Sequence, residues 1–213
     1  AAIGPGPQEE IRLRAGMMAA VDEGVGALFA ALERSDALDD TVIVFFGDNG
    51  YFFGEHGLGP ERRFPYEEGI RSPFLVRYPG RIKAGAGLRE LVIWEDIPPT
   101  LIELAGGKPG QQIQGRSLLP LVSGRTTSWR KSFLIEYWAE NAMPWLVGMT
   151  YKAVRTDRYK YIHWVNKSRD HELDEMYDLD TDPFELRNLN GSRSHARVRE
   201  KLRRELARLV VEA

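Results

Sequence analysis

An unbroken run of β-branched and aromatic residues, Thr41 to Phe46, leads directly into Gly47-Asp48-Asn49-Gly50. A run without polar interruptions is typical of a strand covered on both faces, as in a parallel α/β sheet. Ligand sites in open α/β sheets lie beyond the carboxyl ends of strands, where Asp48 and Asn49 are placed. Two adjacent oxygen donors on a glycine-flanked backbone suit a hard divalent cation such as calcium or magnesium. The pattern therefore predicts part of a metal site.

A hairpin turn is the alternative for the same segment, because Asn-Gly is a strong two-residue turn signal. Only three apolar residues, Tyr51 to Phe53, follow before Gly54. So short a return strand is a poor partner for the 41–46 strand. Both interpretations stay open on local sequence alone.

The first part of the chain has the pattern of an α/β domain. Apolar residues at helical spacing, from Leu13 to Leu32, predict an amphipathic helix over about 8–35. Strands are expected at 41–46 and 73–78, and a short third strand at 91–93. Pro98 and Pro99 are expected in the first turn of a helix that ends near residue 105.

Short strand-like segments dominate the second part, and they indicate an antiparallel meander. Strands are expected at 133–135, 147–151 and 159–164, before a final helix that carries Val198, Leu202, Leu206 and Leu209. We therefore expect an α/β part at 1–125 and a smaller α+β subdomain, an antiparallel sheet plus a helix, at 126–213.

Composition excludes several classes of function. The 29 basic and 31 acidic residues nearly balance, so no nucleic-acid partner is expected. No stretch approaches about 18 uninterrupted apolar residues, so no transmembrane segment is expected. The first residues lack the charged and apolar regions of a signal peptide. The chain has no cysteine, which excludes a cysteine nucleophile or a zinc-thiolate site within it.

Two further groups of polar residues follow the glycine-rich segment. His56 lies in Gly54-Glu55-His56-Gly57, and a lone histidine is more often a hydrogen-bonded structural residue than a catalytic one. Glu67 and Glu68 are adjacent and so point in different directions in regular structure. We expect them to pair structurally, for example with Arg71 or Arg77.

Four segments together resemble the type I sulfatases in order and spacing, across almost the whole chain. They are Thr41 to Tyr51, Gly54 to Leu58, Tyr66 to Gly80 and Met176 to Leu189. The resemblance implies an alkaline-phosphatase-like fold with a mixed, mostly parallel sheet sandwiched by helices. It implies hydrolysis of sulfate esters by a formylglycine, which is expected upstream of Ala1. It also implies periplasmic, extracellular or lysosomal proteins, although the sequence itself leaves the compartment unknown.

The resemblance assigns roles to particular residues. Asp48 and Asn49 would bind calcium, or magnesium, and His56 would approach the sulfate or the leaving group. The family commonly has a sulfate-binding lysine shortly after this histidine, but residues 59–64 contain none. Arg62 is the preferred substitute, counting back from Tyr66, and Arg63 is the second choice. A guanidinium can bind two sulfate oxygens at once.

The leading prediction is therefore a sulfatase fragment that supplies part of a calcium site and a sulfate pocket. Its expected partners are a sulfated small molecule or carbohydrate and the N-terminal part of the same protein. One alternative is a phosphonate monoester hydrolase or phosphodiesterase of the same superfamily. Another is a non-catalytic binding module that kept the fold.

Overall fold

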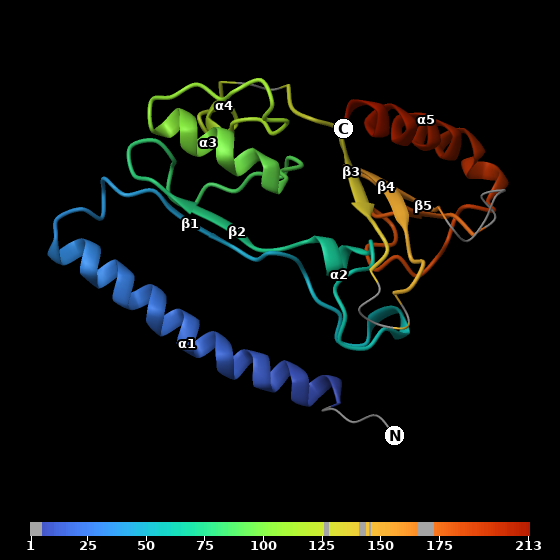
Figure 1. Cartoon of the computed structure of the whole chain (residues 1–213), viewed down its shortest axis with the longest axis horizontal. Helices are drawn as coiled ribbons and strands as arrows, with labels where there is room; N and C mark the ends of the chain where they lie inside the picture. The colour runs from blue at the N-terminus through green and yellow to red at the C-terminus, as the bar shows by residue number, and fades with distance from the viewer. Residues whose placement is uncertain (1–5, 126–127, 141–143, 145, 166–172) are drawn as a thin grey trace. The chain divides into compact units, whose positions relative to one another are not determined.

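The computed structural model describes residues 6–125, 128–140, 144, 146–165 and 173–213. Within it the chain forms two compact units, residues 1–86 and 87–213. Figure 1 gives the element labels used below. This division by contacts does not test the expected boundary between an α/β part at 1–125 and a subdomain at 126–213. That boundary therefore stays a prediction.

The first unit contains a long helix, a strand pair and two short helices. Its elements are α1 (Pro7–Arg34), β1 (Ile43–Phe46), the 3-10 helix η1 (Glu55–Gly57), α2 (Glu67–Ile70) and β2 (Phe74–Arg77). The helix expected at 8–35 and the strands expected at 41–46 and 73–78 all form.

The first two strands are antiparallel, a pairing that the expected mixed, mostly parallel sheet allows. Ile43 lies opposite Arg77, and Phe46 lies opposite Phe74. The Gly47 amide donates to the Pro73 carbonyl at 3.1 Å, so the chain leaves β1 and enters β2 at the same end of the ladder. A parallel pair needs a crossover to the opposite end. The 47–73 segment makes no such crossover.

Helix α1 buries none of its residues within this chain. Its exposed apolar side chains include Met17, which is 60% exposed, and Leu28, which is 65% exposed. By length and composition this helix is also apolar enough to cross a membrane. That is weak evidence for a membrane span, because core helices of soluble proteins pass the same test.

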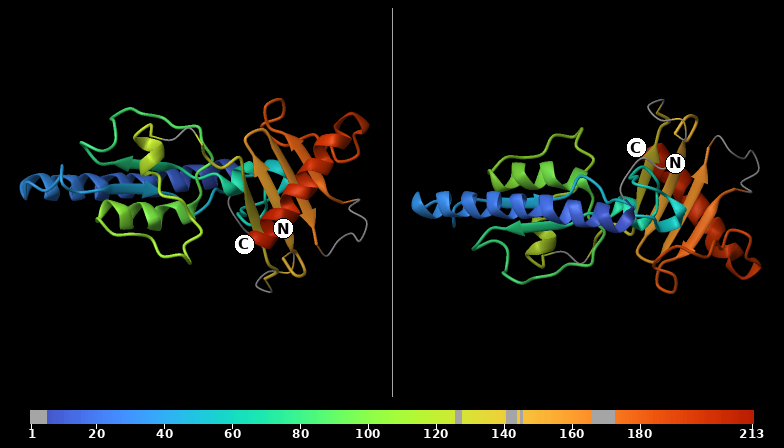
Figure 2. Two further views of the ribbon diagram at one scale, coloured as in Figure 1. Left: turned by 90° about the horizontal axis from the view of Figure 1, so that it is seen from above. Right: turned by 90° about the horizontal axis from the view of Figure 1, so that it is seen from below.

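The second unit contains the antiparallel sheet and its helix. Its helices are η2 (Trp94–Asp96), α3 (Ile97–Leu104), α4 (Leu119–Val122), η3 (Arg193–His195) and α5 (Ala196–Glu212). Its strands are β3 (Ser132–Tyr137), β4 (Tyr151–Thr156), β5 (Tyr159–Trp164) and β6 (Glu175–Asp178), which pair in that order, each antiparallel to the next. Helix α5 covers one face of this sheet (Figure 2). The expected meander and final helix are confirmed.

Three details of this unit differ from the sequence expectations. Residues 91–93 form no strand. Strand β4 begins at Tyr151, where the expected 147–151 strand would have ended, and β6 was not expected. The core between sheet and helix contains Val154, Tyr161, Met176, Leu202 and Leu206.

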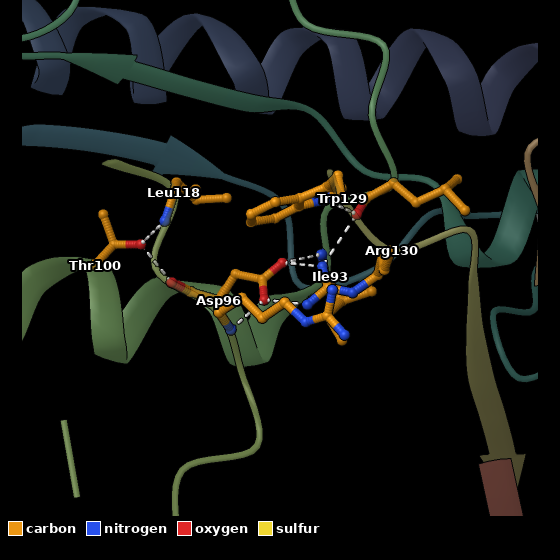
Figure 3. A network of polar contacts seen from close by, with 8 residues as sticks. Ile93, Asp96, Thr100, Leu118, Trp129 and Arg130 are labelled. Atoms are coloured by element: carbon orange, nitrogen blue, oxygen red, sulfur yellow. Dashed lines mark hydrogen bonds and ion pairs between the residues drawn. The ribbon is translucent and has the colours of Figure 1, made fainter. Parts of the chain in front are cut away.

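A buried ion pair organises the α3 region (Figure 3). The Asp96 carboxylate is fully buried and binds the Arg130 guanidinium with both oxygens, at 2.6 Å from Oδ1 to one guanidinium nitrogen. The same carboxylate accepts the amides of Ile93, at 2.9 Å, and Arg116, at 2.8 Å. Trp129 donates its indole N–H to the Leu91 carbonyl at 2.7 Å. Residues 91–93 are therefore held by these hydrogen bonds rather than by a strand partner.

Candidate active site

Asp48 and Asn49 lie where the chain turns between β1 and β2. The Gly47 amide continues the strand ladder, and the Gly50 amide donates to the Gly69 carbonyl at 2.9 Å. Asp48 is exposed and Asn49 is half-buried. Within the described residues, neither side chain makes a hydrogen bond or ion pair. Both side chains are thus available as ligands to a partner outside the described chain.

The segment that holds these two residues depends on a close backbone approach. A Cβ atom on Gly50 would lie 1.8 Å from the Glu68 carbonyl oxygen and 2.7 Å from that of Arg71. Only glycine leaves room for α2 at this distance. The hairpin alternative is therefore wrong here, since Gly50 contacts α2 and the chain continues into Phe52, which bridges to Glu61.

The donor set of Asp48 and Asn49 fits one part of a hard-cation site. One carboxylate and one amide oxygen are ligands that calcium and magnesium accept, but calcium takes six to eight oxygens. Among the described residues, no group of three or more acidic, histidine or cysteine side chains is arranged to hold a metal. The described part of the chain can contribute two ligands, and the remaining ligands must come from elsewhere.

His56 is held by a hydrogen bond and by ring contacts. Its Nε2 lies 3.2 Å from Glu68 Oε2, and its ring stacks on Tyr66 with 3.9 Å between the ring centroids. Phe52, fully buried, meets the imidazole edge-on at 6.2 Å. His56 has a backbone φ of 56°, a left-handed conformation that is uncommon for a residue other than glycine.

The two candidate arginines have different environments. Glu61 is buried, and its Oε1 accepts the amides of Arg62 at 2.7 Å and Arg63 at 3.1 Å. The same oxygen binds the Arg63 guanidinium at 3.0 Å. Arg62 is exposed, and its guanidinium makes no ion pair with any described residue. Of the two, Arg62 is the cation whose charge is not already neutralised.

Phe52 and α2 bring these segments together. The Phe52 amide donates to the Glu61 carbonyl at 2.9 Å. This hydrogen bond attaches the arginine turn, residues 61–63, to the segment that follows Asn49. The Phe52 ring packs against Gly69 of α2, where an added Cβ would meet it at 2.9 Å. Asp48, Asn49, His56 and the arginine turn therefore belong to one packed assembly within the first unit.

Sequence reasoning singled out one of the two glutamates that organise the site, Glu68, but did not predict His56 as its partner. Glu68 pairs with His56, whereas Arg77 binds Asp39 at 2.7 Å, so the expected pairing of a glutamate with Arg77 is wrong for Glu68. Glu61 was not singled out. The sequence signal for these two contacts was only a glutamate close in sequence to a histidine or an arginine. Such pairs are too common to predict a specific contact.

A family model described as N-sulphoglucosamine sulphohydrolase, C-terminal, matches residues 54–212. An N-acetylglucosamine-6-O-sulfatase of Bacteroides thetaiotaomicron is 38% identical over 189 residues, covering 86% of this chain and 32% of the relative. An arylsulfatase of Volvox carteri is 32% identical, covering 96% of this chain and 35% of that protein. The chain thus spans about a third of the length of these relatives.

Solved structures agree on the fold. A protein in complex with its substrate D-glucosamine-2-N,6-O-disulfate matches 90% of this chain and 38% of its own, with a TM-score of 0.80 and 35% identity. A phosphonate monoester hydrolase of Agrobacterium radiobacter matches 92% of this chain and 40% of its own, with a TM-score of 0.80 and 27% identity.

Proposed function

Because this chain belongs to the sulfatase family, we propose that it is the part of a sulfuric ester hydrolase that supplies half of a calcium site and one side of the sulfate pocket. The observation that carries the proposal is the packed assembly of Asp48, Asn49, His56 and Arg62. These residue types, in this order, are the ones that the family resemblance assigns to metal and sulfate. We infer further that the substrates are sulfated carbohydrates, the class to which the disulfated glucosamine of the structural neighbour belongs.

We propose that the rest of the site comes from the remaining two thirds of the protein, including the parallel strands of the sheet. The exposed apolar side chains of α1 support this, since a soluble protein rarely leaves so many exposed along one helix. A formylglycine in that part would provide the nucleophile that attacks sulfur. Asp48 and Asn49 would hold calcium, or magnesium, whose charge polarises the sulfate oxygens.

The residues of this chain would then act on the substrate anion and its leaving group. The guanidinium of Arg62, which pairs with no carboxylate in the described part of the chain, would bind sulfate oxygens, with Arg63 as the second choice. His56 would donate a proton to the ester oxygen as it leaves, because its ring is held by a hydrogen bond and ring stacking and has a second nitrogen, Nδ1, besides the one that Glu68 binds. The amide of Asn49 would limit the negative charge close to an anionic substrate.

A phosphonate monoester hydrolase is the second candidate, and the match to the Agrobacterium enzyme favours it specifically. The identity of 27% is lower than the 35% and 38% of the two sulfatase-type matches. We therefore place it second. A non-catalytic module is third, because Asp48 and Asn49 are retained.

The test is an assay of the complete protein with three substrates: N-acetylglucosamine 6-sulfate, 4-nitrophenyl sulfate and a phenylphosphonate monoester. We expect release of inorganic sulfate, inhibition by chelators, and a formylglycine in the peptide map of the upstream part. Faster hydrolysis of the phosphonate than of either sulfate would favour the second candidate. Hydrolysis of none of the three would favour the non-catalytic module.

A further inference from the structure

Glu68 holds the imidazole of His56 from one side. Its Oε2 lies 3.2 Å from Nε2, and the two side chains are only 18% and 11% exposed. An ionised carboxylate only accepts hydrogen bonds, so Nε2 carries the hydrogen in this contact. The hydrogen bond therefore decides which ring nitrogen is left for a substrate, and that nitrogen is Nδ1.

The aromatic contacts fix the plane of the same ring. Tyr66 stacks on it at an interplanar angle of 12°, and Phe52 meets it at 79°. With the hydrogen bond to Glu68, these contacts define both the tilt and the rotation of the imidazole. His56 keeps this position in spite of a left-handed backbone conformation, which is unfavourable for a residue that is not glycine. Strain of this kind is commonly found at functional sites.

Glu68 also contacts the metal-binding segment through its backbone. Its carbonyl oxygen is the atom that a Cβ on Gly50 would strike at 1.8 Å, and Gly50 directly follows Asn49. The next residue, Gly69, accepts the Gly50 amide at 2.9 Å. One residue of α2 thus supports His56 with its side chain and the end of the Asp48-Asn49 turn with its main chain.

We propose that Glu68 is a positioning residue that presents Nδ1 of His56 to the leaving oxygen of the substrate. The inference rests on the proposed function and deepens it. When both ring nitrogens carry hydrogen, Glu68 balances the charge of the imidazolium, and Nδ1–H is the ring donor that Glu68 does not bind. As a nucleophilic oxygen from the rest of the protein forms its bond to sulfur, the bond between sulfur and the bridging oxygen breaks; its electron pair stays on the bridging oxygen, which takes the Nδ1 proton. The imidazole is then neutral and regains a proton from solvent.

The test uses the complete enzyme and a series of aryl sulfates from 4-nitrophenyl to 4-methoxyphenyl sulfate. A good leaving group needs no proton, whereas a poor one does. Loss of general acid catalysis therefore lowers kcat more for poor leaving groups than for good ones. For Glu68→Ala we expect kcat to fall about 100-fold on 4-methoxyphenyl sulfate and no more than about 3-fold on 4-nitrophenyl sulfate, with KM little changed. Glu68→Gln, which keeps an acceptor but no charge, should lie between wild type and Glu68→Ala.

Two controls separate positioning from a purely structural role. Glu200→Gln removes a carboxylate paired with Arg204 in α5 and should leave the leaving-group dependence unchanged. In a His56→Asn background, Glu68→Gln should cause no further loss, because the two residues act as one unit. Equal losses on all aryl sulfates, or additive losses in the double variant, would overturn the proposal.

The outcome also distinguishes this inference from the proposed function. A wild-type enzyme that hydrolyses no aryl sulfate would overturn both. An active wild type with an equally active Glu68→Gln variant would overturn only the role of Glu68. Metal content and melting temperature of Glu68→Gln should match wild type, so that any loss in kcat is not a loss of folded enzyme.

Discussion

At the scale of single residues, the candidate site depends on which charges are already paired. Glu61 neutralises Arg63, and Glu68 binds His56, whereas Arg62 has no such carboxylate among the described residues. A paired cation stabilises the loop, and an unpaired exposed one is available to an anion. Neighbouring arginines in one turn can therefore have different functions.

Replacing the two arginines in turn tests this difference. Arg62→Ala should raise KM for sulfate esters about tenfold or more, because a charge-assisted contact contributes about 1.5 to 3 kcal/mol, while the melting temperature stays near wild type. Arg63→Ala should lower the free energy of unfolding by about 1 to 3 kcal/mol, because it leaves the buried Glu61 carboxylate without its cation. Steady-state kinetics gives KM, and urea unfolding gives the free energy of unfolding. Equal effects on KM would show that the assignment of Arg62 is wrong.

Asp48 tests the metal assignment. Asp48→Ala removes the only charged ligand that this turn offers, so calcium affinity and kcat should both fall strongly. Asn49→Asp is the matched variant, because it keeps an oxygen ligand while it adds a charge beside the substrate anion. Calorimetric titration with calcium gives the affinity. Normal metal content with near wild-type turnover in Asp48→Ala would contradict a role in metal binding.

At the scale of elements, buried or half-buried carboxylates connect segments that are distant in sequence. Asp96 joins the turn before α3 to the chain that enters β3 (Figure 3). Glu205 of α5 accepts the Ser132 hydroxyl at the start of β3 and binds Arg208 at 2.6 Å. The second unit is therefore held by polar contacts at the ends of its elements as well as by the apolar core.

Asp96→Asn should destabilise the second unit by about 3 kcal/mol or more, because it leaves the Arg130 guanidinium, only 7% exposed, without its counter-charge. Urea unfolding followed by tryptophan fluorescence measures the loss, since Trp129 lies beside this ion pair. Glu95→Gln, at the exposed neighbouring position, is the control and should change stability little.

Glu205 predicts a pH dependence of stability. The Arg208 guanidinium, with help from the Ser132 hydroxyl, lowers the pKa of this carboxyl from 4.5 to about 2. A lowered pKa in the folded state stabilises the protein above the unfolded pKa, and this contribution is lost as the pH falls from about 4.5 towards about 2. Glu205→Gln should therefore destabilise the chain by about 1 kcal/mol at about pH 6 and by much less at about pH 2.5. A constant difference across this range would contradict the prediction.

At the scale of the whole molecule, the chain is about a third of the length of its relatives, and among the described residues none of α1 is fully buried. We expect the remaining part of the protein to bury the apolar side of α1. Hydrogen exchange should show α1 amides poorly protected in the 213-residue chain alone and well protected in the complete protein. Equal exchange in both, with partition of the chain into lipid vesicles, would instead favour a membrane role for this helix.

Much of the fold could be predicted from local patterns. The apolar spacing of residues 13–32 and the alternation of short strands and turns gave α1, α5 and the antiparallel meander. The strand expected at 91–93 was wrong because hydrogen bonds to the nearby Asp96 and to Trp129, which lies much further along the chain, replace strand pairing there. The apolar run of β1 correctly predicted a strand, but in this chain its residues are half-buried or exposed, not covered on both faces as expected. The pairing direction depends on where the chain returns, which no local pattern encodes.

In the candidate site, too, some features follow from the sequence and others only from the tertiary structure. Sequence alone determined which residue types are present and in what order, because Asp48, Asn49, His56 and the arginine pair follow one another in a recognisable spacing. Tertiary structure decided how they are paired and packed: Glu61 neutralises Arg63, Glu68 binds His56, and Gly50 lets α2 approach the turn that holds Asp48 and Asn49. The physical reason is that charge pairing and close packing act between atoms within a few ångströms, and folding brings such atoms together regardless of their separation along the chain.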